Sequence, residues 1–266
     1  MNLLSGITGR LTYILTEVGG GLLFLKEVVV TAIRIPTDRK TVLQQIYNVT
    51  TQSAVNTGAS GFFVGAIMTV QFLIQLKVFS AQSVLGGLVT SGAVRELGPL
   101  LIAFMLSGKV GAYTSAELGT MRVTEQIDAM KCLGTNPMQY LIVPRFLAIV
   151  ISSFLLFLVG LTMSVLGGIV MANLMGNMSA MEYLNGIPVF VKWVSVAGGL
   201  FKCLMFGIVL ATICTYKGYT TTGGARGVGR TVIATALSTM VGIVLMDWFT
   251  TFIWKAAVGI AGGDVG

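Results

Sequence analysis

The chain has 266 residues, of which 55% are apolar and only 10% are charged, and its mean hydropathy is +0.87. About a quarter of the residues in a soluble domain are charged, so this composition excludes an ordinary soluble protein and indicates an integral membrane protein. The formal net charge of +7 is explained by basic loops beside anionic lipid headgroups and requires no nucleic-acid partner.

The first 35 residues are expected to form an amphipathic helix that lies along the membrane surface. Apolar residues recur every three to four positions, and five charged residues interrupt any run long enough to cross a bilayer. A cleaved signal peptide is the alternative, but no basic residue precedes Arg10 and no clear small-x-small cleavage site follows. Pro36 is expected to end this helix, and Thr37 or Asp38 to cap the next one.

Residues 36–266 are predicted to form one domain with five transmembrane spans. Crossing the hydrocarbon layer takes about 20 helical residues. Residues 146–172 are uncharged, and residues 193–216 and 231–254 contain one charge each, Lys202 and Asp247. The predicted fold class is an all-α integral membrane protein with an N-terminal interfacial helix. The spans are expected at about residues 44–76, 92–112, 144–172, 193–216 and 231–256.

The basic residues predict the orientation of the spans. A cytoplasmic N-terminus places twelve of the 17 Lys and Arg residues in cytoplasmic segments. The outer side then receives only Lys77, Arg95, Lys192 and Lys255. This asymmetry satisfies the positive-inside rule, so we expect the C-terminus on the outer side.

A polar segment at residues 119–137 separates the second span from the third. Thr114 and Glu117 have the spacing of a capping box. Beyond them, apolar residues recur every three to four positions, at Val123, Ile127, Met130 and Leu133. The pattern predicts a cytoplasmic amphipathic helix over about residues 117–133. It is either a docking surface for a soluble partner or a solvated connector on the membrane.

Several chemistries are excluded by residues that the sequence lacks. Without histidine, Ser-His and Cys-His nucleophiles and His-ligated zinc or haem are impossible. Cys132, Cys203 and Cys214 are isolated and form no CxxC pair. There is no G-x-x-x-x-G-K-[ST] motif to cradle ATP, and the Gly-rich residues 221–231 are interpreted as a tight cytoplasmic turn. No catalytic residue, metal ligand or cofactor is predicted.

Lys202 and Asp247 are expected to pair across consecutive antiparallel spans. Counted from the outer ends of their helices, both lie about 10 to 14 Å below the same membrane surface. An isolated charge there costs at least ~2.5 to 3.5 kcal/mol, so pairing is favoured, and we interpret it as a structural clamp.

Two candidate functions can be weighed from the residues alone. An ion- or proton-coupled secondary transporter would use Glu96, Lys202 and Asp247. An intramembrane lipid-modifying enzyme is disfavoured by the absence of histidine and of clustered carboxylates.

Two segments of the chain carry a specific resemblance. They are RELGPLLIAFMLSGKVGAYTSAELGTMRVTEQIDAMKCLGTNP at residues 95–137, followed by Pro144-Arg145, and GGARGVGRT at residues 223–231. The chain resembles the MlaE (YrbE) family of ABC-transporter permeases, which move phospholipids or related lipids between bacterial membranes. The resemblance implies a non-catalytic homodimeric permease in the bacterial inner (cytoplasmic) membrane, with its C-terminus in the periplasm. The implied partners are a cytoplasmic ABC ATPase, often a STAS-domain protein, and a periplasmic MCE-domain lipid-binding protein.

The resemblance also implies two sets of site residues. The polar helix would be a coupling helix that binds in a groove of the ATPase through an E-Q-x-x-A-type motif. Its contact residues would be Glu125, Gln126, Ile127, Asp128, Ala129 and Met130. The lipid pocket would lie between two protomers, lined by the outer half of the first span and the start of the second. Its residues would be Met68, Gln75, Leu76, Phe79, Arg95, Glu96 and Leu97. Gln75 departs from the aliphatic residue usual in the family and makes this wall more polar.

Overall fold

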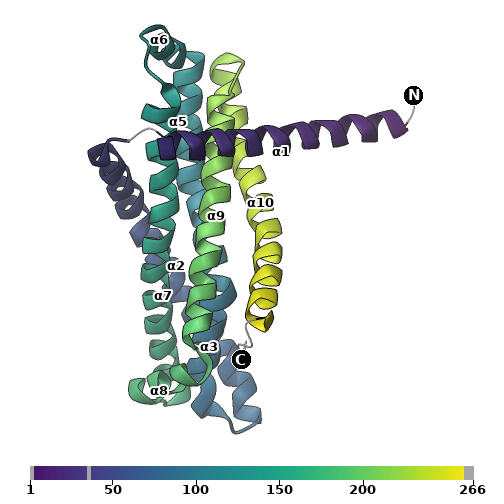
Figure 1. Cartoon of the computed structure of the whole chain (residues 1–266). Helices are drawn as coiled ribbons and strands as arrows, with labels where there is room; N and C mark the ends of the chain where they lie inside the picture. The colour runs from purple at the N-terminus through teal and green to yellow at the C-terminus, as the bar shows by residue number, and fades with distance from the viewer. Residues whose placement is uncertain (1–2, 35–36, 261–266) are drawn as a thin grey trace.

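The computed structural model describes residues 3–34 and 37–260 of the chain, and these residues contain no strand (Figure 1). Five helical stretches are long and apolar enough to cross a membrane. They are Arg39–Val78, Gln82–Val123, Met138–Gly176, Trp193–Tyr219 and Gly224–Ile260. The prediction of an all-α membrane protein with five spans is confirmed.

Helix α1 (Leu3–Arg34) lies across the long helices instead of running beside them (Figure 1). Phe24 and Val28 are buried against the bundle, whereas Leu15, Leu22 and Leu23 are exposed on α1. A helix that lies along the membrane surface needs exposed apolar side chains to face the lipid. The exposed leucines of α1 meet this requirement. The predicted role of Pro36 falls outside the described residues.

Helix α2 (Arg39–Val78) begins at the predicted N-cap Asp38, whose carboxylate accepts a hydrogen bond from the Lys40 amide at 3.1 Å. It packs along α7 (Val143–Gly176). A Cβ atom at Gly61 or Gly65 of α2 would collide with the backbone of Gly160 or Ser164 of α7. Small residues at four-residue spacing therefore bring these two backbones together, as is common between membrane helices.

The second span is one continuous helical stretch that exceeds the predicted residues 92–112 at both ends. It contains a 3₁₀ turn, η1 (Gln82–Val84), and three α-helical parts, α3 (Leu85–Gly92), α4 (Gly98–Leu106) and α5 (Ala112–Val123). Two π-helical turns, η2 (Ala93–Leu97) and η3 (Ser107–Gly111), join the α-helical parts. At 1.5 Å per residue, its 42 residues reach about 60 Å, which is about twice the thickness of the hydrocarbon layer.

The remaining helices complete the two ends of the bundle. Short α6 (Gln126–Cys132) follows α5, and a π-helical turn, η4 (Met138–Ile142), leads into α7. Helix α8 (Ala180–Phe190) lies at the opposite end from α6 (Figure 1), followed by α9 (Trp193–Tyr219) and α10 (Gly224–Ile260).

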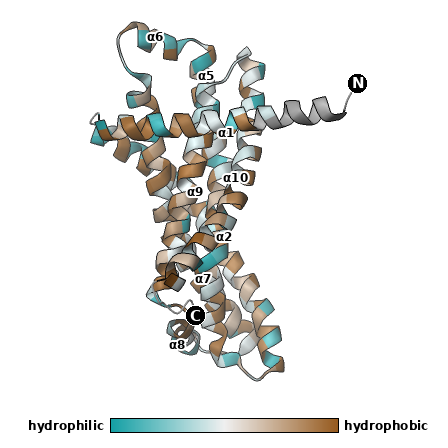
Figure 2. Cartoon of the chain, turned by 45° about the vertical axis from the view of Figure 1, so that its right-hand side comes forward, coloured by the Kyte–Doolittle hydropathy of each residue, from teal (hydrophilic) through white to brown (hydrophobic). Residues whose placement is uncertain are grey.

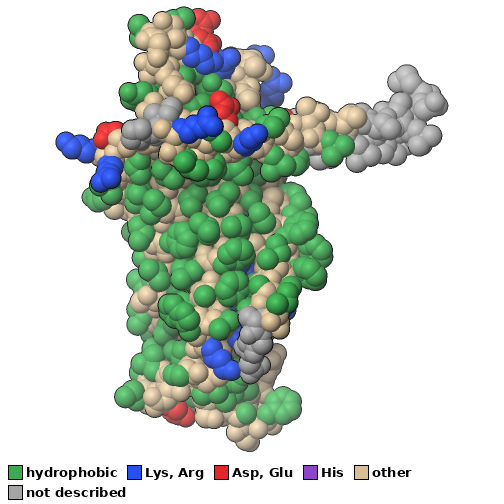
Figure 3. Space-filling view, in the orientation of Figure 1, with side chains coloured by type: hydrophobic (Ala, Val, Ile, Leu, Met, Phe, Trp, Pro, Cys, Tyr) green, Lys and Arg blue, Asp and Glu red, His purple; other side chains and the backbone are tan. Residues whose placement is uncertain are grey.

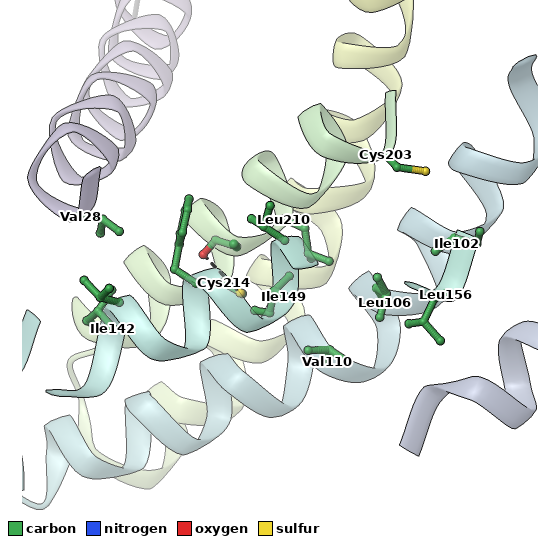
Figure 4. Close-up of a cluster of buried hydrophobic side chains, with 14 of the residues drawn as sticks. Val28, Ile102, Leu106, Val110, Ile142, Ile149, Leu156, Cys203, Leu210 and Cys214 are labelled. Carbon is green, nitrogen blue, oxygen red and sulfur yellow. Dashed lines mark hydrogen bonds between the residues drawn. The ribbon is translucent and has the colours of Figure 1, made fainter. Parts of the chain in front are cut away.

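The largest hydrophobic core lies where α1, α7, α9 and the second span meet. Val28, Val110, Ile149 and Leu210 belong to it (Figure 4). Outside this core, apolar residues run along the long helices (Figure 2), and they form a broad green belt in the space-filling view. Charged side chains gather at α1 and beyond it toward α6 (Figure 3). This distribution fits α1 at one membrane surface with α6 projecting into water.

Candidate functional site

Three charged side chains meet between the second, fourth and fifth spans. Lys202 is buried in α9, and its Nζ lies 2.9 Å from the Asp247 Oδ1 of α10. The same ammonium donates a hydrogen bond to the Glu96 Oε2 of η2. The pairing expected from helix depth is therefore present, and a second carboxylate joins it. The cluster ties the second, fourth and fifth spans together at a depth where an unpaired charge would be costly.

A small, open cavity of about 60 Å³ lies beside this charge cluster. Arg95 and Glu96 line it, together with Ser195, Lys202 and Trp254. The Arg95 guanidinium donates to the Ser195 hydroxyl at 2.9 Å (Nη2) and 3.1 Å (Nε), and to the Phe190 carbonyl at 3.3 Å. Basic, acidic and hydroxyl groups thus lie next to an indole ring, an environment that suits a polar group attached to an apolar one.

The other predicted lipid-binding residues lie elsewhere on the chain. Met68 and Leu76 pack against a second buried cluster that includes Leu73, Leu85 and Tyr183. Gln75 and Phe79 are exposed, and Leu97 is half-buried. None of the α2 residues in the predicted set lines the cavity at Arg95 and Glu96. The seven residues therefore do not converge on one cavity within a single chain.

The predicted cytoplasmic helix over residues 117–133 is broken in the structure. Helix α5 continues the second span to Val123, and Glu125 then adopts a left-handed conformation with φ of 62° before α6 begins. The capping box is also wrong, because Thr114 is buried within α5 and Glu117 pairs with Arg145 at 2.9 Å. The sequence pattern misplaced the start because the helix of the second span does not stop where its apolar residues end.

Helix α6 forms the far tip of the molecule (Figure 1). The side chain of Ile127 is fully buried, whereas Glu125, Gln126 and Ala129 are exposed, as are Cys132 and Leu133 at the end of α6. Five of the six predicted coupling residues, including the half-exposed Asp128 and Met130, therefore share a small accessible surface with the exposed residues next to them.

An ion-pair network shapes this tip. The Asp128 Oδ1 accepts from the Arg122 Nη1 at 2.6 Å and lies 3.3 Å from the Lys131 Nζ. The hydrogen bond from Arg122 is the main cause that lowers the pKa of Asp128 below its ordinary value. These charged partners all lie within the segment itself, so the network holds α6 against the end of α5. Sequence spacing alone did not reveal it.

Of the Gly-rich residues 221–231, only the first three form a turn, and the others already belong to the start of α10. Gly223 and Gly224 have φ of 89° and 64°, a left-handed conformation that favours glycine, and α10 starts at Gly224. The Thr221 hydroxyl lies 3.2 Å from the Thr231 hydroxyl and closes the turn.

Comparisons with known proteins agree with this architecture. The family model described as Permease MlaE matches residues 42–253. A probable ABC transporter permease protein of Synechocystis is 33% identical over 84% of each chain, and one of Rickettsia conorii is 32% identical over 94% of this chain and 96% of its own. The Arabidopsis thaliana protein named TRIGALACTOSYLDIACYLGLYCEROL 1, chloroplastic, is 29% identical over 73% of this chain and 56% of its own. The chain therefore belongs to the MlaE family of permeases and is a multi-pass membrane protein of the ABC transporter type.

Proposed function

We propose that this chain is the membrane-spanning subunit of an ATP-driven phospholipid transporter, and that it works as a dimer with a separate cytoplasmic ABC ATPase. The observation that carries the proposal is α6, a short helix at the tip of the second span with Glu125, Gln126 and Ala129 exposed. An exposed helix at the end of a long transmembrane helix is suited to receive a push from a soluble partner.

The second span offers a direct mechanical route from that partner into the membrane. Helix α5, the turn η3, helix α4 and the turn η2 follow one another without a break. In η2, Glu96 contacts Lys202. Movement of α6 upon ATP-driven closure of the ATPase would be transmitted along this helix to the charge cluster between the spans. The chain itself carries no catalytic role in this scheme, and ATP hydrolysis belongs to the partner.

The choice of a lipid substrate has two supports. The name of the Arabidopsis relative contains that of a galactolipid. In addition, the cavity at Arg95, Glu96 and Lys202 places charged groups beside Trp254, which suits a charged headgroup next to its acyl chains. The pocket between two protomers would add the outer end of α2, with Phe79 as an exposed aromatic side chain.

The setting follows the same proposal. The protein would lie in the bacterial inner membrane with its N-terminus and α6 in the cytoplasm and its C-terminus in the periplasm. An MCE-domain lipid-binding protein would meet the periplasmic side, and a STAS-domain protein could accompany the ATPase.

One observation favours a second candidate function, an ion- or proton-coupled secondary transporter. Glu96, Lys202 and Asp247, the three residues that such a mechanism would use, do meet in the structure. The relatives of this chain that are named ABC transporter permeases favour the first function. Purification of the chain from its native membrane separates the two, because only the ABC transporter requires a nucleotide-binding subunit to accompany it.

The decisive test of the first function changes the charges of the coupling surface. The double variant Glu125→Lys with Asp128→Lys should lose co-purification with the ATPase or uncouple ATP hydrolysis from lipid transport in reconstituted vesicles. Glu182→Lys, an exposed charge reversal on α8 at the opposite end, is the matched control and should leave this docking intact. Normal lipid transport by the double variant would contradict the assignment.

A further inference from the structure

The cytoplasmic end of α9 contacts both the tip helix α6 and the crosswise helix α1. Tyr219, the last residue of α9, takes part in both contacts. Its ring centroid lies 5.9 Å from that of Phe24 on α1, and the Lys131 Nζ of α6 lies 5.6 Å from the centroid of the same ring. One aromatic side chain thus stands between two helices that are about a hundred residues apart in the sequence.

Helix α1 is fixed firmly to this end of α9. Phe24 is only 7% exposed and also packs against Tyr216, with ring centroids 5.6 Å apart. The Glu17 carboxylate lies 2.9 Å from the Lys217 Nζ. Gly20 faces the Tyr216 hydroxyl so closely that a Cβ atom there would collide with it. Because these contacts use both charge and shape, α1 should move with the end of α9.

The contact from α6 is held in place as well. The Asp128 carboxylate lies 3.3 Å from the Lys131 Nζ and accepts a hydrogen bond from Arg122, so Lys131 is restrained beside Tyr219. Electrostatic interaction with Tyr219, followed by hydrogen bonding, raises the pKa of Lys131 above its ordinary value. The ammonium is therefore charged throughout the physiological pH range, as attraction to the face of the ring requires.

We propose that Tyr219 is a positioning residue that links α6 to α1, so that a displacement of the coupling helix moves the membrane-surface helix together with the second span. The proposal rests on the function proposed above, in which α6 docks on an ATPase. It adds a second element, α1, that moves when the ATPase displaces α6. Helix α1 lies across the bundle at one membrane surface. A shift of α1 would alter the contacts of the bundle with lipid headgroups while the spans rearrange.

The chain offers a direct way to measure the link. Cys132 is exposed on α6, whereas Cys203 and Cys214 are buried, so a thiol-reactive spin label attaches selectively next to Lys131. Lys26→Cys, an exposed position on α1, supplies the second label. Because Cys132 lies on the proposed docking surface, the labelled parent must first be shown to keep its ATPase. Pulsed electron–electron double resonance on the purified complex then gives the distance distribution between α1 and α6.

Three variants distinguish the link from a general packing effect. Tyr219→Ala should broaden the distance distribution and weaken the nucleotide-dependent shift between the labels, and it should lower the lipid moved per ATP hydrolysed. Tyr219→Phe keeps the ring that contacts Phe24 and Lys131 but lacks the hydroxyl, so it should restore most of all three properties. Tyr140→Ala removes a tyrosine that is 58% exposed and should behave like the parent.

The outcomes separate this proposal from the function on which it rests. If Tyr219→Ala keeps the parent distance distribution and coupling ratio in the ATPase-bound complex, the link is wrong and the proposed function stands. If no ATPase accompanies the parent chain, the proposed function fails. In that case the label distances of the isolated chain still report whether Tyr219 joins the two helices.

Discussion

The Lys202 Nζ and the Asp247 Oδ1 lie 2.9 Å apart although 45 positions separate the two residues in the sequence. The contact forms because α9 and α10 are consecutive antiparallel helices that bring residues of equal depth side by side. Glu96 shares the same ammonium, so a single buried cation balances two carboxylates. The three members are not equivalent, because the side chain of Lys202 is 5% exposed, that of Asp247 25% and that of Glu96 49%.

Removal of the lysine should therefore be the most harmful change in this cluster. Lys202→Met leaves two carboxylates facing each other, and breaking a buried pair costs about 3 to 5 kcal/mol of unfolding free energy. Asp247→Leu should cost less, because Glu96 still neutralises Lys202. The double variant of Lys202 and Asp247 should recover part of the loss caused by Lys202→Met. Thermal unfolding in detergent measures all three, with Lys255→Met at an exposed position as the control. Additive losses would show that the residues do not interact.

The tip of the molecule should be sensitive to acid. Arg122 lowers the pKa of Asp128 below its ordinary value of 3.8, so Asp128 stabilises the folded tip above that pH. This contribution is lost as the pH falls through the lower folded-state pKa. A spin label on Cys132 should therefore stay ordered at pH values above 3.8 and become mobile as the pH falls below that value.

The variant Asp128→Asn is the control for this acid response. It cannot ionise, so its label should be more mobile than that of the parent at neutral pH. It should also lack the transition that depends on Asp128. Equal mobility of the two proteins at neutral pH would mean that the Arg122 contact does not order α6.

The spans were predictable because partition into lipid depends mainly on local composition, and hydropathy records it. Hydropathy does not indicate where a helix ends once it leaves the lipid, so the predicted second span is too short at both ends. Its π-helical turn at 93–97 shifts the helix register locally and helps to decide which neighbours Arg95 and Glu96 face. No periodicity in the sequence indicated that turn.

The proposed coupling surface on α6 also combines a local feature that the sequence predicts with one that it does not. Its position and polar character followed from the sequence, but the break at Glu125 did not, since a left-handed conformation is unusual for glutamate and no glycine marks it. Contacts such as Glu17 with Lys217 and Lys131 with Tyr219 join distant segments, so they needed the fold. The Gly61-x-x-x-Gly65 spacing was a readable signal for the close approach of α2 to α7.

The α2–α7 contact should tolerate no enlargement at its centre. Gly65→Val places side-chain atoms against the backbone of Ser164, and we expect a loss of about 1 to 3 kcal/mol in unfolding free energy from overpacking. Gly229→Ala is the control, since a Cβ atom there meets no neighbour within 4 Å. It should leave stability unchanged or raise it by up to about 1 kcal/mol. Equal melting temperatures for Gly65→Val and the parent would show that the helices are further apart than in the structure.

The last prediction concerns the lipid pocket proposed for the dimer. Phe79 is 77% exposed in the single chain, so its replacement should disturb the fold little. Phe79→Asp would place a carboxylate against acyl chains at a cost of about 2 to 4 kcal/mol, depending on depth. Phospholipid that co-purifies with the dimer should therefore decrease, as measured by mass spectrometry. Leu76→Asp is a less clean test, because Leu76 packs against the buried cluster at Leu73 and Tyr183.

Two controls make the result at Phe79 interpretable. Phe79→Leu keeps an apolar side chain and should retain lipid. Size-exclusion chromatography must show the same dimer for both variants, so that a loss of lipid is not a loss of assembly. If Phe79→Asp forms the dimer and carries as much lipid as the parent, then the outer end of α2 does not line the pocket. The cavity beside Arg95, Ser195 and Lys202 would then be the place to repeat the experiment.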